Sequence, residues 1–276
     1  MVKGFRSIGT LPLQVDPAQV LTFRLNLPAS RYPDRTAIAA LQSKVLASLQ
    51  ALPGVTSAAV TSNLPRSDYS NRSLITFEGR APEPGLKNIT LVQNISRDFF
   101  RTSGIPFVSG RSFTGSEGAE TQPVAIVSEN FARRYYAAED PIGRRFHLGD
   151  GRYWTVIGIA ADIPYDYVER VPGPVVYLPY QQSTSSAFDL AVRTAGDASA
   201  FIPPVRAAVA AIDPLQPVSL LRSFRKLIDD GILGLGYVAT TLALLGAVAL
   251  FLAVLGVYSL MAYSCLLYTS PSPRDS

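Results

Sequence analysis

The sequence predicts an α+β protein with three parts: a ferredoxin-like split βαβ sheet, an inserted β-rich subdomain, and one transmembrane α-helix at the end. Two βαβ patterns, at about residues 20–63 and 187–222, predict the two halves of the sheet. The stretch between them, about residues 64–186, is too long for a simple connection and is expected to fold by itself. Residues 231–264 contain no charged side chain, and this run exceeds the roughly 20 residues that cross a bilayer.

The first βαβ pattern begins with an alternating, β-rich strand at residues 20–27. Asp34 then caps a helix that runs to about Leu52 and is ended by Pro53-Gly54. Its apolar side chains recur every three or four residues, as on one face of a helix. Residues 55–61 return as a strand.

The second pattern repeats this order near the other end of the chain. Residues 188–194 predict a strand, and residues 200–212 predict a helix with two prolines in its first turn, where a missing N–H costs little. Residues 217–221 predict the closing strand. The segment 20–222 is therefore expected to be one core domain before the membrane helix, and residues 1–19 a juxtamembrane linker.

The insertion is expected to be mostly β-structure with two short helices. The predicted strands cover residues 73–78, 89–95, 123–127, 153–159 and 175–178. One predicted helix covers residues 97–102 and ends at Gly104, and the other follows Ser128 as its cap.

The apolar run is interpreted as a membrane helix with the core domain outside and the C-terminal end inside. The alternative is a buried hairpin of two core helices. Pro or Asn/Asp residues within the run would favour such a hairpin, and the run contains none. Tyr237, Tyr258 and Tyr263 lie toward its ends, where tyrosines favour the membrane interface.

Composition argues against several functions. The 276 residues carry a formal net charge of +4 without a Lys/Arg run, so no nucleic-acid partner is predicted. The single cysteine, Cys265, cannot form an internal disulfide, and the single histidine, His147, has no partner at metal-ligand spacing. No metal site is predicted.

No set of residues has the pattern of a catalytic site. The sequence contains neither G-x-S-x-G nor a Walker-type phosphate loop. The acids Asp162, Asp166 and Glu169 share one loop, for which a solvated surface is favoured over acid/base chemistry or Ca²⁺ binding. The tyrosines of this region are interpreted either as an interface or as strand-edge packing: Tyr165, Tyr167, Tyr177 and Tyr180. Catalytic and cofactor-binding residues are thus predicted to be none, and substrate-binding residues are unknown.

Five stretches in order carry a family resemblance that covers about residues 5–264. They are LTFRLNLPASRYPD with the following LPGVTSAAVTSNLP, ISRDFFRTSGIPFVSGRSFT, PVAIVSENFARRYYAAEDPIGRRF, YWTVIGIAADI with VVYLPYQQ, and the apolar run ending LGVYSLMAYS. Together they resemble the MacB-like periplasmic core domain of large, multi-copy bacterial FtsX-like ABC transporter permeases.

The resemblance implies a non-catalytic permease fragment in the bacterial inner membrane, with its core domain on the periplasmic side. ATP hydrolysis is expected on a separate or fused ATP-binding cassette partner absent from this chain. That hydrolysis would drive export or extraction of an amphiphilic substrate by mechanotransmission. The resemblance further implies a homo- or heterodimer of permeases and admits a periplasmic adaptor protein as partner. It implies no cofactor.

Both ends depart from the family pattern. The first transmembrane helix expected upstream is missing. Residues 265–276, CLLYTSPSPRDS, look unlike a continuation of the helix and resemble a translated transposon-type sequencing adapter. They are expected to be an assembly artefact. The rival interpretation is a single-pass, membrane-anchored sensor or adhesion ectodomain, which would stop soon after the helix.

Overall fold

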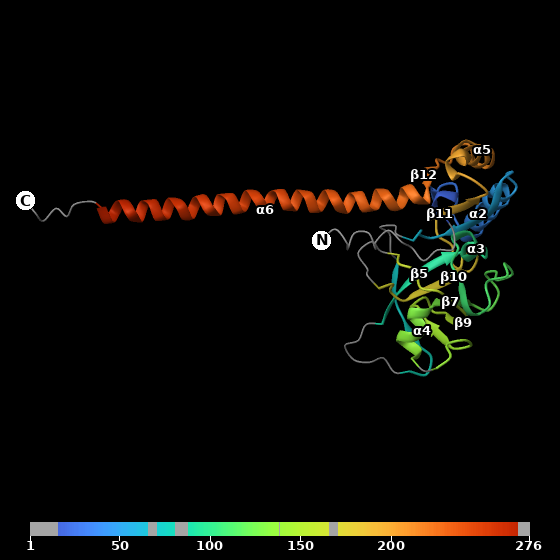
Figure 1. Cartoon of the computed structure of the whole chain (residues 1–276). Helices are drawn as coiled ribbons and strands as arrows, with labels where there is room; N and C mark the ends of the chain where they lie inside the picture. The colour runs from blue at the N-terminus through green and yellow to red at the C-terminus, as the bar shows by residue number, and fades with distance from the viewer. Residues whose placement is uncertain (1–15, 66–70, 81–87, 138, 166–170, 270–276) are drawn as a thin grey trace, which may run out of the picture. The chain divides into compact units, whose positions relative to one another are not determined.

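The structure is a computed structural model that describes residues 16–65, 71–80, 88–137, 139–165 and 171–269 (Figure 1). For residues 231–239 and 263–269 only the backbone is described. The chain divides into two units, of which the first runs to Asp229 and the second begins at Asp230.

Within the described residues, twelve strands form one mixed sheet in the first unit. The strands are β1 Val20–Asn26, β2 Val55–Thr61, β3 Arg72–Leu74, β4 Thr76–Phe77, β5 Ile89–Ile95, β6 Phe107–Gly110, β7 Val124–Ser128, β8 Arg145–His147, β9 Tyr153–Ala160, β10 Val175–Pro179, β11 Ala187–Thr194 and β12 Ser219–Ser223. The helices are η1 Pro17–Gln19, α2 Arg35–Gln50, α3 Phe99–Ser103, α4 Glu129–Tyr136, η2 Ala198–Phe201, α5 Ile202–Ile212 and α6 Phe224–Thr269. The predicted α+β class is confirmed.

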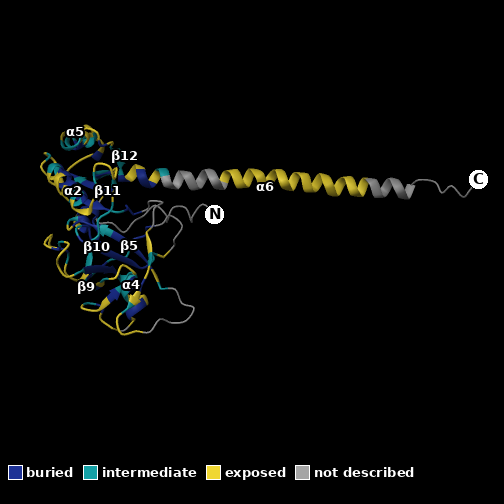
Figure 2. Cartoon of the chain, turned by 180° about the vertical axis from the view of Figure 1, so that it is seen from behind, coloured by how far each residue is buried: buried dark blue, intermediate teal, exposed yellow. Residues whose placement is uncertain are grey.

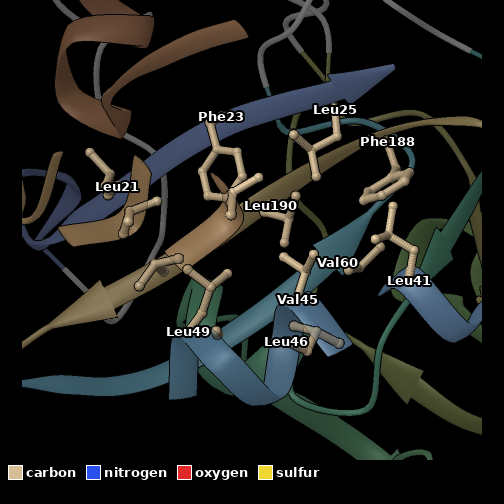
Figure 3. Close-up of a cluster of buried hydrophobic side chains, with 14 of the residues drawn as sticks. Leu21, Phe23, Leu25, Leu41, Val45, Leu46, Leu49, Val60, Phe188 and Leu190 are labelled. Atoms are coloured by element: carbon tan, nitrogen blue, oxygen red, sulfur yellow. The ribbon is translucent and has the colours of Figure 1, made fainter. Parts of the chain in front are cut away.

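The two βαβ patterns interleave at one end of the sheet. The strand order there is β12-β1-β11-β2, and each neighbouring pair is antiparallel. The strands of each βαβ pattern are therefore separated by a strand of the other. Side chains of α2, α5 and this part of the sheet form one buried apolar cluster, in which Phe23, Val45 and Leu190 meet (Figure 3).

In the remainder of the sheet, strands β7 and β10 are buried on both faces. Alternate residues of β7 and β10 enter two different apolar clusters, so that Tyr177 faces one cluster and Val176 the other. Phe99 of α3 belongs to the first of these clusters and Phe131 of α4 to the second. The parallel pairs β10/β5 and β7/β9 lie in this part, as is typical of strands covered on both sides.

One register pair, Thr61 with Ile95, joins the two parts of the sheet through β2 and β5. Backbone hydrogen bonds extend this contact, from Ser62 N to the Asn94 carbonyl oxygen (2.8 Å) and from Ser96 N to the Val60 carbonyl oxygen (2.9 Å). The predicted boundaries of the inserted subdomain, residues 64 and 186, stay a prediction.

Several elements differ from the sequence-based expectation. The strand expected at residues 73–78 is divided into β3 and β4 at Ile75, which is buried and bonds to Asn88 instead. Strands β6 and β8 were not predicted, because strands of four and three residues are too short to show a clear alternation. The closing strand β12 lies two residues later than expected.

The long helix α6 begins at Phe224, seven residues before the predicted start at Gly231, and continues past Ser264 to Thr269. Residues 270–276 of the predicted artefact tail lie outside the described residues, as do residues 1–15 of the predicted linker. The segment Thr240–Ala262 has a mean hydropathy of 2.4 and is long and apolar enough to cross a membrane. Its side chains are exposed in the isolated chain (Figure 2).

Candidate functional site: the junction of the sheet and the long helix

Strand β12 passes into α6 without a connecting residue, because β12 ends at Ser223 and α6 begins at Phe224. The Ser223 hydroxyl oxygen accepts a hydrogen bond from the Lys226 backbone N–H (3.3 Å), as the cap of a helix does. A displacement of the start of the helix must therefore move the end of the strand.

The first two turns of α6 are anchored in the first unit. Phe224, Leu227 and Ile228 follow the i, i+3, i+4 spacing of one helix face and are all less than a tenth exposed. Burying a side chain of this size stabilises the fold by about 1.5–3 kcal/mol. Phe224 lines a small apolar hollow with Val20, Leu64 and Ala191.

Strand β12 is in turn held by β1, in register pairs that include Leu21 with Ser223 and Thr22 with Arg222. The Thr22 hydroxyl donates to the Arg222 carbonyl oxygen (3.0 Å). Strand β1 then pairs with β11 along its whole length. The antiparallel ladder gives a continuous path from the helix into the sheet.

A bulge interrupts the β12 ladder between these pairs. The register shifts between Thr22 and Arg24 of β1, so that Leu220 and Leu221 lie opposite Phe23 alone. Leu220 has a φ of +54°, which is uncommon for a residue other than glycine. β12 is also the last strand of the sheet, and bulges of this kind deter pairing at a free edge.

A buried ion pair ties β1 to β11 on the face opposite α2. Arg24 and Asp189 are register partners, with Nε to Oδ1 at 2.7 Å and Nη2 to Oδ2 at 2.8 Å. Asp189 also accepts from the Leu64 backbone N–H (3.2 Å). Burial raises the pKa of the Asp189 carboxyl, and the Arg24 guanidinium lowers it by less. Because charged residues interrupt otherwise apolar strands at these two positions, the sequence contained a signal for this pair that was missed.

His147 and Asp162, the described residues among those considered for chemistry, have separate partners. The Nδ1 of His147 accepts from the Gly149 N–H (3.0 Å), and the ring lies 5.6 Å from that of Tyr153. Asp162 accepts from the Asn130 N–H (2.6 Å) and pairs with Arg133. Among the described residues, no three His, Cys, Asp or Glu side chains could hold a metal together.

The aromatic residues considered for an interface are mostly buried. Tyr165, Tyr177 and Tyr180 are each less than a tenth exposed, so packing rather than an interface accounts for them. Tyr167 lies outside the described residues, as do Asp166 and Glu169.

The sequence motifs are explained by packing and backbone geometry. In the stretch ISRDFFRTSGIPFVSGRSFT, both aromatic residues of the first pair, Phe99 and Phe100, are buried, and Gly104 ends α3 in the left-handed region. Gly110 has a φ of +77°, and a Cβ there would lie 2.4 Å from the Ile157 carbonyl oxygen. These motif residues shape the core domain.

A family model described as the MacB-like periplasmic core domain matches residues 8–212. The chain is also 30% identical over 103 residues to the macrolide export ATP-binding/permease protein MacB of Hahella chejuensis. This match covers 36% of the chain and 15% of that relative, so only a small part of the relative is represented.

A solved structure of a periplasmic region shows a similar fold. The periplasmic region of MacB from Actinobacillus actinomycetemcomitans matches with a TM-score of 0.54 at 14% identity, over 83% of this chain and 96% of that structure. The extracellular domain of the noncanonic ABC-type transporter YknZ from Gram-positive bacteria matches with a TM-score of 0.46 at 15% identity, over 70% of this chain and 91% of that structure.

Proposed function

Because the chain belongs to the family of MacB-like periplasmic core domains, we propose that it serves as the extracytoplasmic core of a bacterial ABC transporter permease. In this role it is non-catalytic and couples ATP hydrolysis in the cytoplasm to export or extraction of an amphiphilic substrate. The sequence contains no Walker-type loop, so the ATP-binding cassette belongs to a partner subunit or to another part of the same polypeptide.

The direct passage from β12 into α6 is the observation that carries this proposal. Mechanical coupling requires that a movement of a membrane helix reach the core domain without being absorbed by a flexible linker. Here the helix start is packed by Phe224 and Leu227, and the strand before it is held in the β12-β1-β11 ladder. The segment Thr240–Ala262 of the same helix supplies the candidate membrane span.

The strand order β12-β1-β11-β2 supports a porter-type, ferredoxin-like subdomain made of residues 20–63 and 187–222. The segment 64–186 is then the inserted subdomain. In the assembled transporter two permeases form a dimer in the inner membrane, with both core domains on the periplasmic side, where an adaptor protein is a further partner.

The sequence of the gene in its source DNA, on both sides of the codons for Met1 and Ser264, tests the proposal. A permease gene encodes an apolar helix upstream and, downstream, a basic cytoplasmic loop with further helices. A reading frame that starts at Met1 and stops after Ser276 would contradict the permease role. It would favour a single-pass sensor or adhesion domain instead.

A further inference from the structure

A hollow of about 280 Å³ opens at the end of the sheet where β1 begins and β11 ends. Its lining combines the segment before β1, the start of β2, helix α3 and the end of β11. The polar residues of this lining are Gln19, Thr56, Ser57, Arg101, Arg193 and Thr194. None of these side chains is acidic, so the hollow is walled by hydrogen-bond donors and two guanidinium groups.

The two arginines lie close together, and among the described residues only Arg101 of the two pairs with a carboxylate. Nη1 of Arg193 donates to the backbone carbonyl oxygen of Arg101 (3.4 Å), which fixes its guanidinium beside α3. In the described part of the chain, no carboxylate lies within ion-pair distance of Arg193. Arg101 pairs with Asp98 (3.2 Å), and its side chain is still 64% exposed. Two positive groups beside one hollow favour an anion between them.

Neutral groups complete the donor set. The buried Ser57 hydroxyl oxygen accepts from Thr102 Oγ1 (3.0 Å), which leaves the Ser57 proton to be donated elsewhere. The hydroxyls of Thr56 and Thr194 donate to backbone carbonyl oxygens at 3.2 Å and 3.0 Å, and so hold the rim in place. These hydrogen bonds hold the strand side of the hollow in place, and the Ser57 hydroxyl offers a hydrogen-bond donor there.

The carboxylates nearest in the sequence are already engaged. Asp16 and Asp197 each accept a backbone N–H at the start of a 3-10 helix (2.9 Å and 3.0 Å). Asp98 lies between Arg97 and Arg101 and pairs with both. None of the three lines the hollow.

The hollow lies at the end of the sheet where α6 starts. Arg193 is the register partner of Val20, and the next residue of β1, Leu21, is the partner of Ser223, the last residue before the helix. An anion bound here would therefore contact the strands that hold the junction.

We propose that this hollow binds a phosphate-type oxyanion through Arg193, Arg101 and Ser57. The planar, multi-donor guanidinium group matches the oxygens of a phosphate, and a charge-assisted hydrogen bond is stronger than a neutral one. A free phosphate and the phosphate of a phospholipid headgroup present the same chemistry. The site rests on the geometry of the core domain alone and does not depend on the transport role.

Hydrogen–deuterium exchange of the full chain tests the site. In a maltoside detergent, which carries no phosphate, inorganic phosphate is added at constant ionic strength, and exchange is followed in the peptides that contain Thr56 and Thr194. In a second arm, nanodiscs that contain phosphatidylglycerol replace the detergent and the added phosphate. Each arm is run with the wild type, with Arg193→Gln and with Arg206→Gln, a control that removes an exposed arginine of α5 outside the hollow.

The expected result is slower exchange in these peptides for the wild type and for Arg206→Gln. Arg193→Gln should bind phosphate or lipid about tenfold more weakly. Losing one charge-assisted hydrogen bond of about 1.4 kcal/mol lowers the affinity by this factor. Protection by added phosphate supports a soluble oxyanion, and protection only in phosphatidylglycerol discs supports a lipid headgroup. No protection in either arm, or equal protection in all three proteins, would overturn the proposal.

Discussion

The Arg24–Asp189 pair is the residue-scale feature that most constrains the junction. Both side chains are almost fully buried, and each supplies the countercharge of the other between β1 and β11. A buried pair adds little net stability over an apolar replacement, whereas removing one partner leaves an uncompensated charge. The pair therefore favours the correct register of the two central strands.

Asp189→Ala is expected to lower the free energy of unfolding by about 3–5 kcal/mol, because it removes the carboxylate that accepts two hydrogen bonds from the buried Arg24 guanidinium. The double variant Arg24→Met with Asp189→Leu should recover most of this loss. Urea unfolding of the full chain in detergent, followed by the fluorescence of the single tryptophan, Trp154, measures both. Glu78→Ala removes an exposed pair with Arg145 and should leave the midpoint nearly unchanged. An equal loss in the double variant would contradict this account.

Glu117 gives the fold a dependence on pH. Burial raises the pKa of this carboxyl, but hydrogen bonds from Thr114, Arg111 and Gly115 together bring it below its ordinary value of 4.5. An acid whose pKa is lowered in the folded state stabilises the fold above its ordinary pKa, and this contribution is lost as the pH falls through the folded-state pKa.

At pH 7, Glu117→Gln should therefore be less stable than the wild type by about 1–3 kcal/mol, the cost of charge-assisted hydrogen bonds. The difference should shrink as the pH falls from 4.5 through the lowered folded-state pKa, because the unfolded carboxyl is protonated first and the folded one after it. Thermal unfolding at a series of pH values checks this. A difference that stays constant with pH would assign the loss to packing instead of charge.

At the scale of elements, the start of α6 belongs to the core domain. Leu227→Ala is expected to destabilise the first unit by about 2–5 kcal/mol through loss of a buried leucine. Leu215→Ala, at a leucine that is 76% exposed, serves as the control and should change stability by less than about 0.5 kcal/mol.

Hydrogen exchange locates the effect of Leu227→Ala. If α6 is coupled to the sheet through β12, exchange should become faster in β12 and β1 as well as in the first turns of the helix. An increase confined to the helix would show that the junction does not transmit the perturbation.

Most long elements could be predicted from the sequence, because their side-chain periodicity reflects burial. Strands β2 and β5 have the predicted bounds, and Asp34 and Ser128 cap the helices expected to follow them. The start of α6 was missed because Arg225, Lys226 and two aspartates interrupt the apolar run. The buried spacing of Phe224, Leu227 and Ile228 was the helix signal in that segment.

The junction itself could not be predicted from the sequence. It depends on long-range pairing: Leu21 and Ser223 are register partners although they are far apart in the chain. Nothing in local periodicity specifies that β12 lies beside β1, nor that Arg193 and Arg101 come to line one hollow.

At the scale of the whole molecule, the exposed apolar helix needs a nonaqueous environment. Leucine, valine and phenylalanine side chains along Thr240–Ala262 are about half exposed or more in the isolated chain. At about 1.5 Å per residue the 23 residues of this segment span about 34 Å, enough for the roughly 30 Å core of a bilayer. An exposed apolar helix of this length is typical of a membrane-anchored protein.

The side of the membrane on which the core domain lies tests the account most directly. In cells that express the gene in its native context, two single-cysteine variants are compared: Ala119→Cys, on an exposed loop, and Ser264→Cys, at the C-terminal end of the apolar run. A membrane-impermeant maleimide added to intact spheroplasts should label Ala119→Cys fully. Ser264→Cys should react only after the membrane is permeabilised. Protection of Ala119→Cys until lysis would place the core domain in the cytoplasm and contradict a periplasmic permease core.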